Sequence, residues 1–264
     1  MKKYIIIILI LICLFYLYDI IIKYKSECSE KWTNIDSNSR KNEWSEKWTK
    51  IDFEARKNDS CKVIQKEYKK LGMIDTWIWT MDKTCENGLP HTRDYNIMAI
   101  PENYPIYFLP KTIEHEKIHL HQRRNINDWK KFYKIYWDYE IFEKPPQTMP
   151  LELIEMKRAN PDTNDAPFSC WKHTWWAVPV YKSLSDLKFI NCIIKWWNEK
   201  TNEIFTDPPD EWIHFFGSNV YQTEHPHEIS AVYIANILFG NYDESIKGMN
   251  ILNEKWDSIN EKFR

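Results

Sequence analysis

The hydrophobic pattern divides the chain into three parts. Residues 4–22 are apolar almost without interruption, close to the ~20 residues that a helix needs to cross a bilayer, and only Asp19 breaks the run. Residues 26–60 are mostly polar, whereas residues 61–264 mix apolar and polar positions as folded domains do. We therefore expect a membrane anchor over residues 1–25, a juxtamembrane helical spacer next, and one globular domain over the rest.

The apolar run is predicted to stay attached to the mature chain. A cleaved signal peptide is the alternative, but residues 23–29 contain no small-residue cleavage pattern. More lysines follow the run than precede it, which weakly favours a cytosolic body by the positive-inside rule. The prediction is a single-pass membrane protein whose body lies on an undetermined side.

The spacer contains an internal repeat with an offset of sixteen residues. Ser29–Asp36 recurs as Ser45–Asp52, and Arg40–Asn42 recurs as Arg56–Asn58. On one straight helix this offset would turn the second copy by about 160°. Two short helices that fold back, or a stalk, fit the repeat better than one long helix. A spacer without chemistry is the favoured role.

The periodicity of the remaining residues predicts an α+β fold that is mainly helical. Strand-like composition occurs in three segments, which are 76–79, 96–100 and 105–109. Helical spacing of apolar residues follows in three others, which run from Trp129 to Tyr139, from Leu187 to Trp197 and from Met249 to Phe263. The prolines between Glu143 and Ser169 predict a long irregular connection of the kind that often frames a site.

Composition excludes some classes of function. A net charge of -2 and the absence of a dense basic run argue against nucleic acid as a partner. The 14 Trp, 15 Tyr and 12 Phe residues predict an aromatic core. None of the six cysteines forms a C-x-x-C pair, which argues against a cysteine-ligated zinc. One or two disulfides are possible, but their pairing does not follow from spacing.

The clearest chemical motif is the sequence His115-Glu116-Lys-Ile-His119. It lies in an expected helix that follows Pro110 and opens at Thr112, a good N-cap residue type. Two histidines four residues apart share one helix face and can bind one metal ion, while the glutamate beside the first can address a water on that ion. Zinc would lower the pKa of this water, and the carboxylate would accept its proton during attack on a carbonyl.

Chance alone produces a His-Glu-x-x-His motif in roughly one chain in a hundred, so other residues have to support the site. Zinc needs a third protein ligand. The metzincin pattern is excluded, because it requires Gly and His where this chain has Gln122 and Asn125. Glu228 is the favoured ligand. It lies on the apolar stripe of a helix expected to begin at Pro226, where a buried carboxylate needs a partner. Glu224 remains the alternative.

A His-Glu-x-x-His helix followed by a second helix with Glu-x-x-Ala resembles the gluzincins, the thermolysin-like branch of zinc metallopeptidases. The resemblance implies a zincin-like catalytic domain with Zn²⁺ bound by His115, His119 and Glu228, Glu116 as general base, and a strand beside the substrate before the first helix. It covers two short helices. The gap of about a hundred residues between them exceeds the usual family spacing, and Val232 replaces an Asp that some members place after the ligand.

Two further expectations concern nearby side chains. His121 follows the motif by two residues, so it should point away from the metal and into solvent. The donor that stabilises a tetrahedral oxyanion is expected among four residues of the second helix region, which are Tyr221, His225, His227 and Tyr233.

The function expected from these residues is that of a membrane-anchored zinc metallopeptidase. Its partners would be a peptide or protein substrate and, through residues 4–22, a membrane. The alternative is a membrane-tethered interaction protein that binds no metal or binds zinc only for structure.

Overall fold

A computed structural model of the protein describes residues 49–56, 60–72, 74–94, 96–185, 187–218 and 224–261. These residues belong to one compact unit, 47–264. The expected anchor and the first copy of the repeat lie outside the described residues. No helix within the described ranges is long and apolar enough to cross a membrane.

The first sheet supports the motif helix. Its strands are β1 (Val63–Leu71), β2 (Ile74–Met81), β3 (His91–Arg93) and β4 (Ile97–Pro101), in the order β1-β2-β4-β3. Strands β2 and β4 run parallel, and the other neighbours run antiparallel. The exposed edge strand β1 is lysine-rich, which discourages pairing with other chains. Apolar β4 is wholly buried, and its Met98 packs with Leu120 of the next helix.

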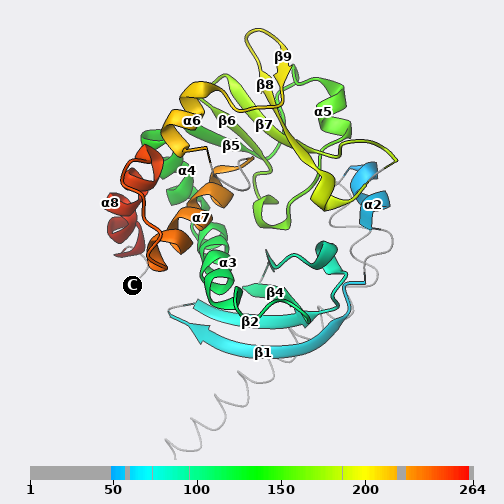
Figure 1. The fold of residues 1–264 in the computed structure, drawn as a ribbon, viewed down its shortest axis with the longest axis vertical. Coiled ribbons are helices and arrows are strands. Elements are labelled where there is room, and N and C mark those ends of the chain that lie inside the picture. The colour runs from blue at the N-terminus through cyan, green and yellow to red at the C-terminus, as the bar shows by residue number, and fades with distance from the viewer. Residues whose placement is uncertain are drawn as a thin grey trace, which may run out of the picture. The chain divides into compact units, whose positions relative to one another are not determined.

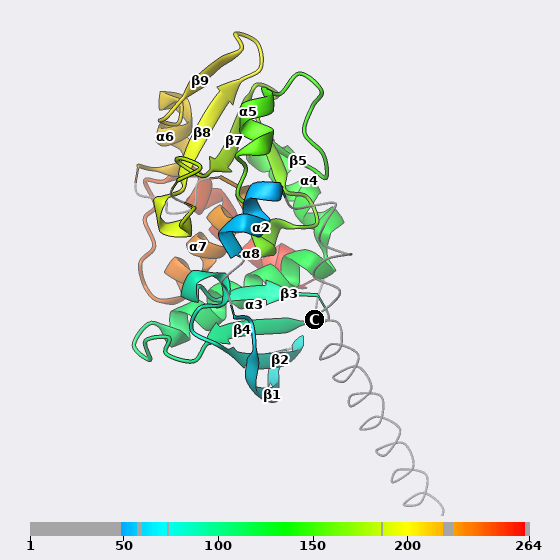
Figure 2. The same cartoon turned by 90° about the vertical axis from the view of Figure 1, so that its right-hand side faces the viewer.

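The helices of the unit lie between and beside the first sheet and a second sheet (Figures 1 and 2). They are α2 (Lys50–Arg56), α3 (Leu109–Arg124), α4 (Ile126–Tyr136), α5 (Leu151–Glu155), α6 (Asp210–Phe216), α7 (Pro226–Leu238) and α8 (Lys247–Glu261). Figures 1 and 2 show the first sheet along one side of α3 and the second sheet at the opposite end of the unit. The strand expected at 105–109 is absent. That segment forms turns and the first residue of α3, whose first turn contains Pro110.

A five-stranded second sheet makes the predicted mainly helical class wrong. Its strands follow chain order and are all antiparallel: β5 (Tyr139–Phe142), β6 (Phe168–Trp171), β7 (Trp175–Val180), β8 (Ile193–Asn198) and β9 (Glu203–Phe205). The protein is α+β with two sheets, and the transmembrane helix of the predicted fold is not among its described elements. Strand β8 was expected to be helical, because Ile190, Ile194 and Trp197 also fit helical spacing. β-branched and aromatic residues fill this short segment, and they favour a strand that pairs on both sides.

An aromatic core joins the helices to the second sheet. Trp129, Tyr133 and Trp137 are at most 1% exposed and pack against one another and against Tyr233 of α7. His121 belongs to this core, so its predicted exposure to solvent is wrong. It is 7% exposed, and the indole N–H of Trp129 donates to its Nδ1 atom at 2.9 Å.

The second copy of the repeat docks on the body through α2. Asp52 accepts hydrogen bonds from the backbone N–H of Ala159 and from the hydroxyl of Tyr181. The Arg56 guanidinium pairs with Asp52 at 2.8 Å and with Glu86 at 2.9 Å. These buried charges are mutually compensated, so α2 is fixed against the body rather than free as a spacer.

A disulfide joins Cys61, just before β1, to Cys85, between β2 and β3, and so closes a loop that contains β1 and β2. Cross-linking residues 24 positions apart removes loop-closure entropy from the unfolded chain. Replacing both cysteines by Ser should therefore lower the free energy of unfolding by about 3 kcal/mol. Urea denaturation followed by tryptophan fluorescence measures this loss. The matched control Cys192→Ser, which removes a half-buried free thiol, should cost far less, and equal stability of all three proteins would contradict the bridge.

Candidate metal centre

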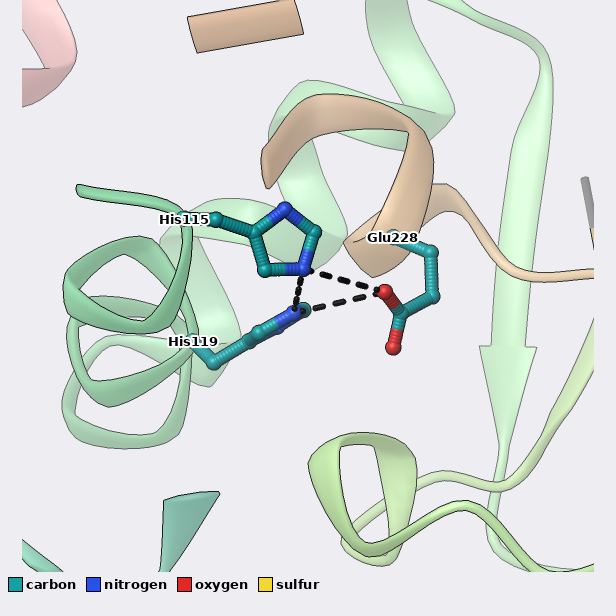
Figure 3. Close-up of side chains that lie close together, drawn as sticks. All are labelled: His115, His119 and Glu228. Carbon is teal, nitrogen blue, oxygen red and sulfur yellow. Dashed lines mark hydrogen bonds and ion pairs between the residues drawn. The ribbon is translucent and has the colours of Figure 1, made fainter. Parts of the chain in front are cut away.

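Two packed helices bring the predicted ligands together. Helix α3 carries His115 and His119 on one face, and α7 carries Glu228 in its first turn (Figure 3). Helix α3 begins three residues earlier than expected, and Thr112 does not cap it. Its hydroxyl lies 2.8 Å from the hydroxyl of Tyr104 instead.

The three ligand atoms form a compact triangle. The Nε2 atoms of His115 and His119 are 3.0 Å apart, and each lies 3.4 Å from Oε2 of Glu228. Bonds of about 2.0–2.1 Å in a tetrahedral zinc site place neighbouring ligand atoms about 3.3–3.4 Å apart. The two separations from Glu228 match this value, and the two imidazole nitrogens lie slightly closer together than it. Of the His, Cys, Asp and Glu side chains in the described ranges, these three form the group that could hold a metal ion.

Gln122 fixes the ring of His119. Its Nε2 amide donates to the carbonyl of His227 at 3.0 Å and to the hydroxyl of Ser230 at 2.9 Å. Its oxygen therefore faces Nδ1 of His119 at 2.8 Å, so that Nδ1 carries the hydrogen of this bond. When the ring is neutral, as in a metal complex, its Nε2 lone pair is directed toward the other two ligand atoms, as metal-binding histidines require.

Asn160 orients the carboxylate of Glu228. Its Nδ2 amide donates to Oε1 at 2.7 Å. The other oxygen, Oε2, is buried and has no hydrogen-bond partner among the described residues. Both imidazole Nε2 atoms lie 3.4 Å from this oxygen, and a cation between the three groups would compensate its charge. The residues present therefore fit a metal ion.

Charge and burial oppose each other at these groups. Burial raises the pKa of Glu228, but the charges of His119 and His115 outweigh it and hold that pKa well below the usual range. Burial lowers the pKa of His119, whereas Glu228 and Asp162 raise it, to about 10. Glu228 is thus an ionised carboxylate, and a bound metal would take the place of the histidine proton beside it.

Glu116 lies beside the triangle. It is 3% exposed, and its Oε2 has no hydrogen-bond partner in the part of the chain that is described. Burial, followed by the charges of Asp162 and Glu228, raises the pKa of its carboxyl well above the usual range. A carboxyl with a raised pKa accepts a proton more readily than an ordinary glutamate does, and the Oε2 atom is placed to receive one.

The site opens into a cavity of about 430 Å³. His115 and Glu116 line it, whereas the fully buried His119 and Glu228 lie behind them. Its other walls come from β3 and the segment before it, the N-terminal part of α3, the connection after α5, and α7, and include His91, Tyr104, Lys111, Arg158, Asn160, Asp162, Phe189, Val232 and Asn236. A ligand in this cavity would meet the exposed side of the metal site.

The expected oxyanion donors do not line this cavity. His225 caps α7: its Nδ1 accepts from the backbone of His227, and its Nε2 faces the carbonyl of Ala166. Tyr233 donates to the carbonyl of Phe216, and His227 is buried against Tyr133. These three positions therefore do not supply the donor. Tyr221 lies outside the described residues.

Glu224, the alternative ligand, does not join the triangle. It is buried, and its backbone carbonyl accepts from Ser169. The structure also reveals supporting residues that sequence patterns missed. Gln122 follows His119 by three residues, a spacing that could have identified it. Asn160 reaches the site from the proline-rich connection, and no spacing signal connects it to the motif.

Comparisons with protein-family models, curated proteins and solved structures found no match for this chain. The resemblance to gluzincins therefore stays a prediction from two helices.

Removing either supporting amide should weaken zinc binding without removing a ligand. We expect Asn160→Ala and Gln122→Leu each to lower zinc affinity about 10–100-fold, the usual effect of losing a residue that orients a ligand. Competition with a zinc-binding dye measures the affinity. The matched variant Asn253→Ala, on the exposed face of α8, should bind zinc as the wild type does. Unchanged affinity in both supporting variants would mean that zinc binds elsewhere.

Proposed function

We propose that this chain is a zinc-dependent peptidase of the gluzincin type, with His115, His119 and Glu228 as ligands and Glu116 as general base. One observation carries the proposal: a ligand triangle with separations close to those of a zinc site faces a cavity through His115, with a proton-accepting carboxyl beside it. Structural zinc sites use four protein ligands and are closed to solvent. Three ligands beside an open cavity favour a catalytic site.

The residues around the site suit hydrolysis of an amide bond. A zinc ion held there would lower the pKa of a bound water and polarise the substrate carbonyl. Glu116 would accept a proton from the attacking water and pass it to the leaving amine, which its raised pKa favours. Gln122 and Asn160 would keep the ligands in place meanwhile.

The cellular location of the site is also a proposal. Membrane attachment through residues 4–22 remains a prediction from the sequence. The Cys61–Cys85 disulfide is of a kind that persists in oxidising compartments. We propose that the body lies in such a compartment, which opposes the weak preference that the flanking lysines indicate.

Changing Glu116 to Gln should separate catalysis from zinc binding. Because this variant keeps all three ligands and loses the proton acceptor, we expect it to retain zinc and to lose about 10²–10⁴-fold in peptide hydrolysis. Mass spectrometry of a broad peptide library measures cleavage, and metal analysis measures zinc. The control Glu114→Gln changes a neighbouring half-buried carboxylate that pairs with Lys117, so activity should persist. A zinc-loaded wild type that cleaves no peptide in the library would refute the peptidase.

A further inference from the structure

Arg158 is a cation in the wall of the cavity that pairs with no carboxylate of the described residues. Its backbone is fixed, because its N–H donates to the carbonyl of Pro179 at 2.8 Å and the preceding residue bridges to β7. Its side chain lines the cavity, and the guanidinium lies 5.3 Å from the ring centre of Phe189. Within the described ranges it makes no ion pair and no side-chain hydrogen bond, and its Nε atom is enclosed without a partner.

Arg56 lies beside Arg158 at the same aromatic ring, and its guanidinium has the acceptors that Arg158 lacks among the described residues. Its guanidinium lies over the same Phe189 ring at 4.3 Å. Unlike Arg158, it pairs with Asp52 and Glu86 and donates to the carbonyl of Ala159. A half-buried guanidinium that lacks such acceptors has lost part of its hydration without compensation. This contrast indicates that the acceptor for Arg158 comes from outside the chain.

Two of the three carboxylates in the cavity wall are already engaged, and the third, Glu116, makes no ion pair with Arg158 among the described contacts. Glu86 pairs with Arg56, and Asp162 accepts from the backbone N–H and the hydroxyl of Thr92. Glu224 lies near enough for Arg158 to lower its pKa, although burial raises that pKa overall. It makes no ion pair with Arg158 at 4 Å or less among the described contacts. No neighbouring carboxylate therefore compensates this cation directly.

The position of Arg158 links it to the metal site. It precedes Asn160, which holds Glu228, by two residues, and both side chains line the cavity. A ligand in this cavity can therefore meet both the guanidinium and the exposed side of the metal site. Lys111 adds a second cation to the cavity wall, one helical turn before His115, and it makes no ion pair with a described residue.

We infer that Arg158 is a specificity-determining residue that binds a carboxylate of a substrate held in this cavity. An Arg–carboxylate pair can form two parallel hydrogen bonds, which gives it both strength and orientation. The carboxylate could belong to an acidic side chain or to the C-terminus of a peptide. The inference rests on the proposed peptidase function, but binding can test it without turnover.

The test uses the full-length, zinc-loaded Glu116→Gln protein and calorimetric binding of matched peptide pairs. One set of pairs differs by Glu against Gln at each position, and the other by a C-terminal carboxylate against a carboxamide. For one set, we expect the acidic peptide to bind about 10–100-fold tighter than its neutral partner, as hydrogen bonds to a charged group allow. The set that shows the preference identifies the source of the carboxylate.

Adding Arg158→Gln should reduce the acidic-to-neutral affinity ratio to near one. Lys111→Gln should reduce it less, because a lysine binds carboxylates as a point charge rather than in a bidentate pair. Lys200→Gln, which removes an exposed charge in the β8–β9 turn, should leave the ratio unchanged. A ratio that survives Arg158→Gln, or that is near one for every pair, overturns the inference.

The two proposals fail in different ways. Peptides that are hydrolysed by the wild type without any acidic preference would remove the Arg158 subsite and leave the peptidase. Arg158-dependent binding of acidic peptides that the wild type never cleaves would leave the subsite and remove the peptidase.

Discussion

The interaction on which the structure depends is the meeting of Glu228 with two imidazoles between α3 and α7. The Glu228 carboxylate is 1% exposed, and an ionised carboxylate in such a place costs several kcal/mol unless other groups compensate it. His115 and His119 approach one oxygen, and Asn160 bonds the other. Much of the fold holds these four side chains in position.

Each layer of the unit contributes to this frame. The first sheet supports α3 from one side through buried apolar strand β4. The aromatic core packs against α7 from the other side, and Tyr133 contacts the Ser230 hydroxyl that also receives Gln122. The α2 segment fixes the connection that carries Asn160, because Asp52 bonds the backbone of Ala159. Distant elements thus converge on a few ligand-supporting contacts.

The candidate site was largely predictable from the sequence because its ligands lie on helices. A separation of four residues places His115 and His119 on one helix face, and the apolar stripe around Glu228 indicates a buried carboxylate. Helical periodicity also gave a wrong prediction for the segment that forms strand β8. The apolar residues of β8 fit both periods, and only pairing with β7 and β9 decides between them.

Contacts between distant segments were not predictable. His121 is buried because Trp129 and Trp256 pack around it, which no local pattern records. Asn160 and Arg158 gain their roles from the path of a proline-rich connection through the site. The docking of the second repeat copy is also a contact of this kind. It is made by Thr49, Asp52 and Arg56, and the first copy has the same residue types at the corresponding positions.

We propose that one zinc ion binds at the triangle between α3 and α7. Diffraction data collected just above and just below the zinc absorption edge, from crystals of protein purified without chelators, test it most directly. The account predicts one anomalous peak that appears above the edge, within bonding distance of Nε2 of His115, Nε2 of His119 and Oε2 of Glu228. A peak at any other position, or no peak in crystals soaked with zinc, would contradict it.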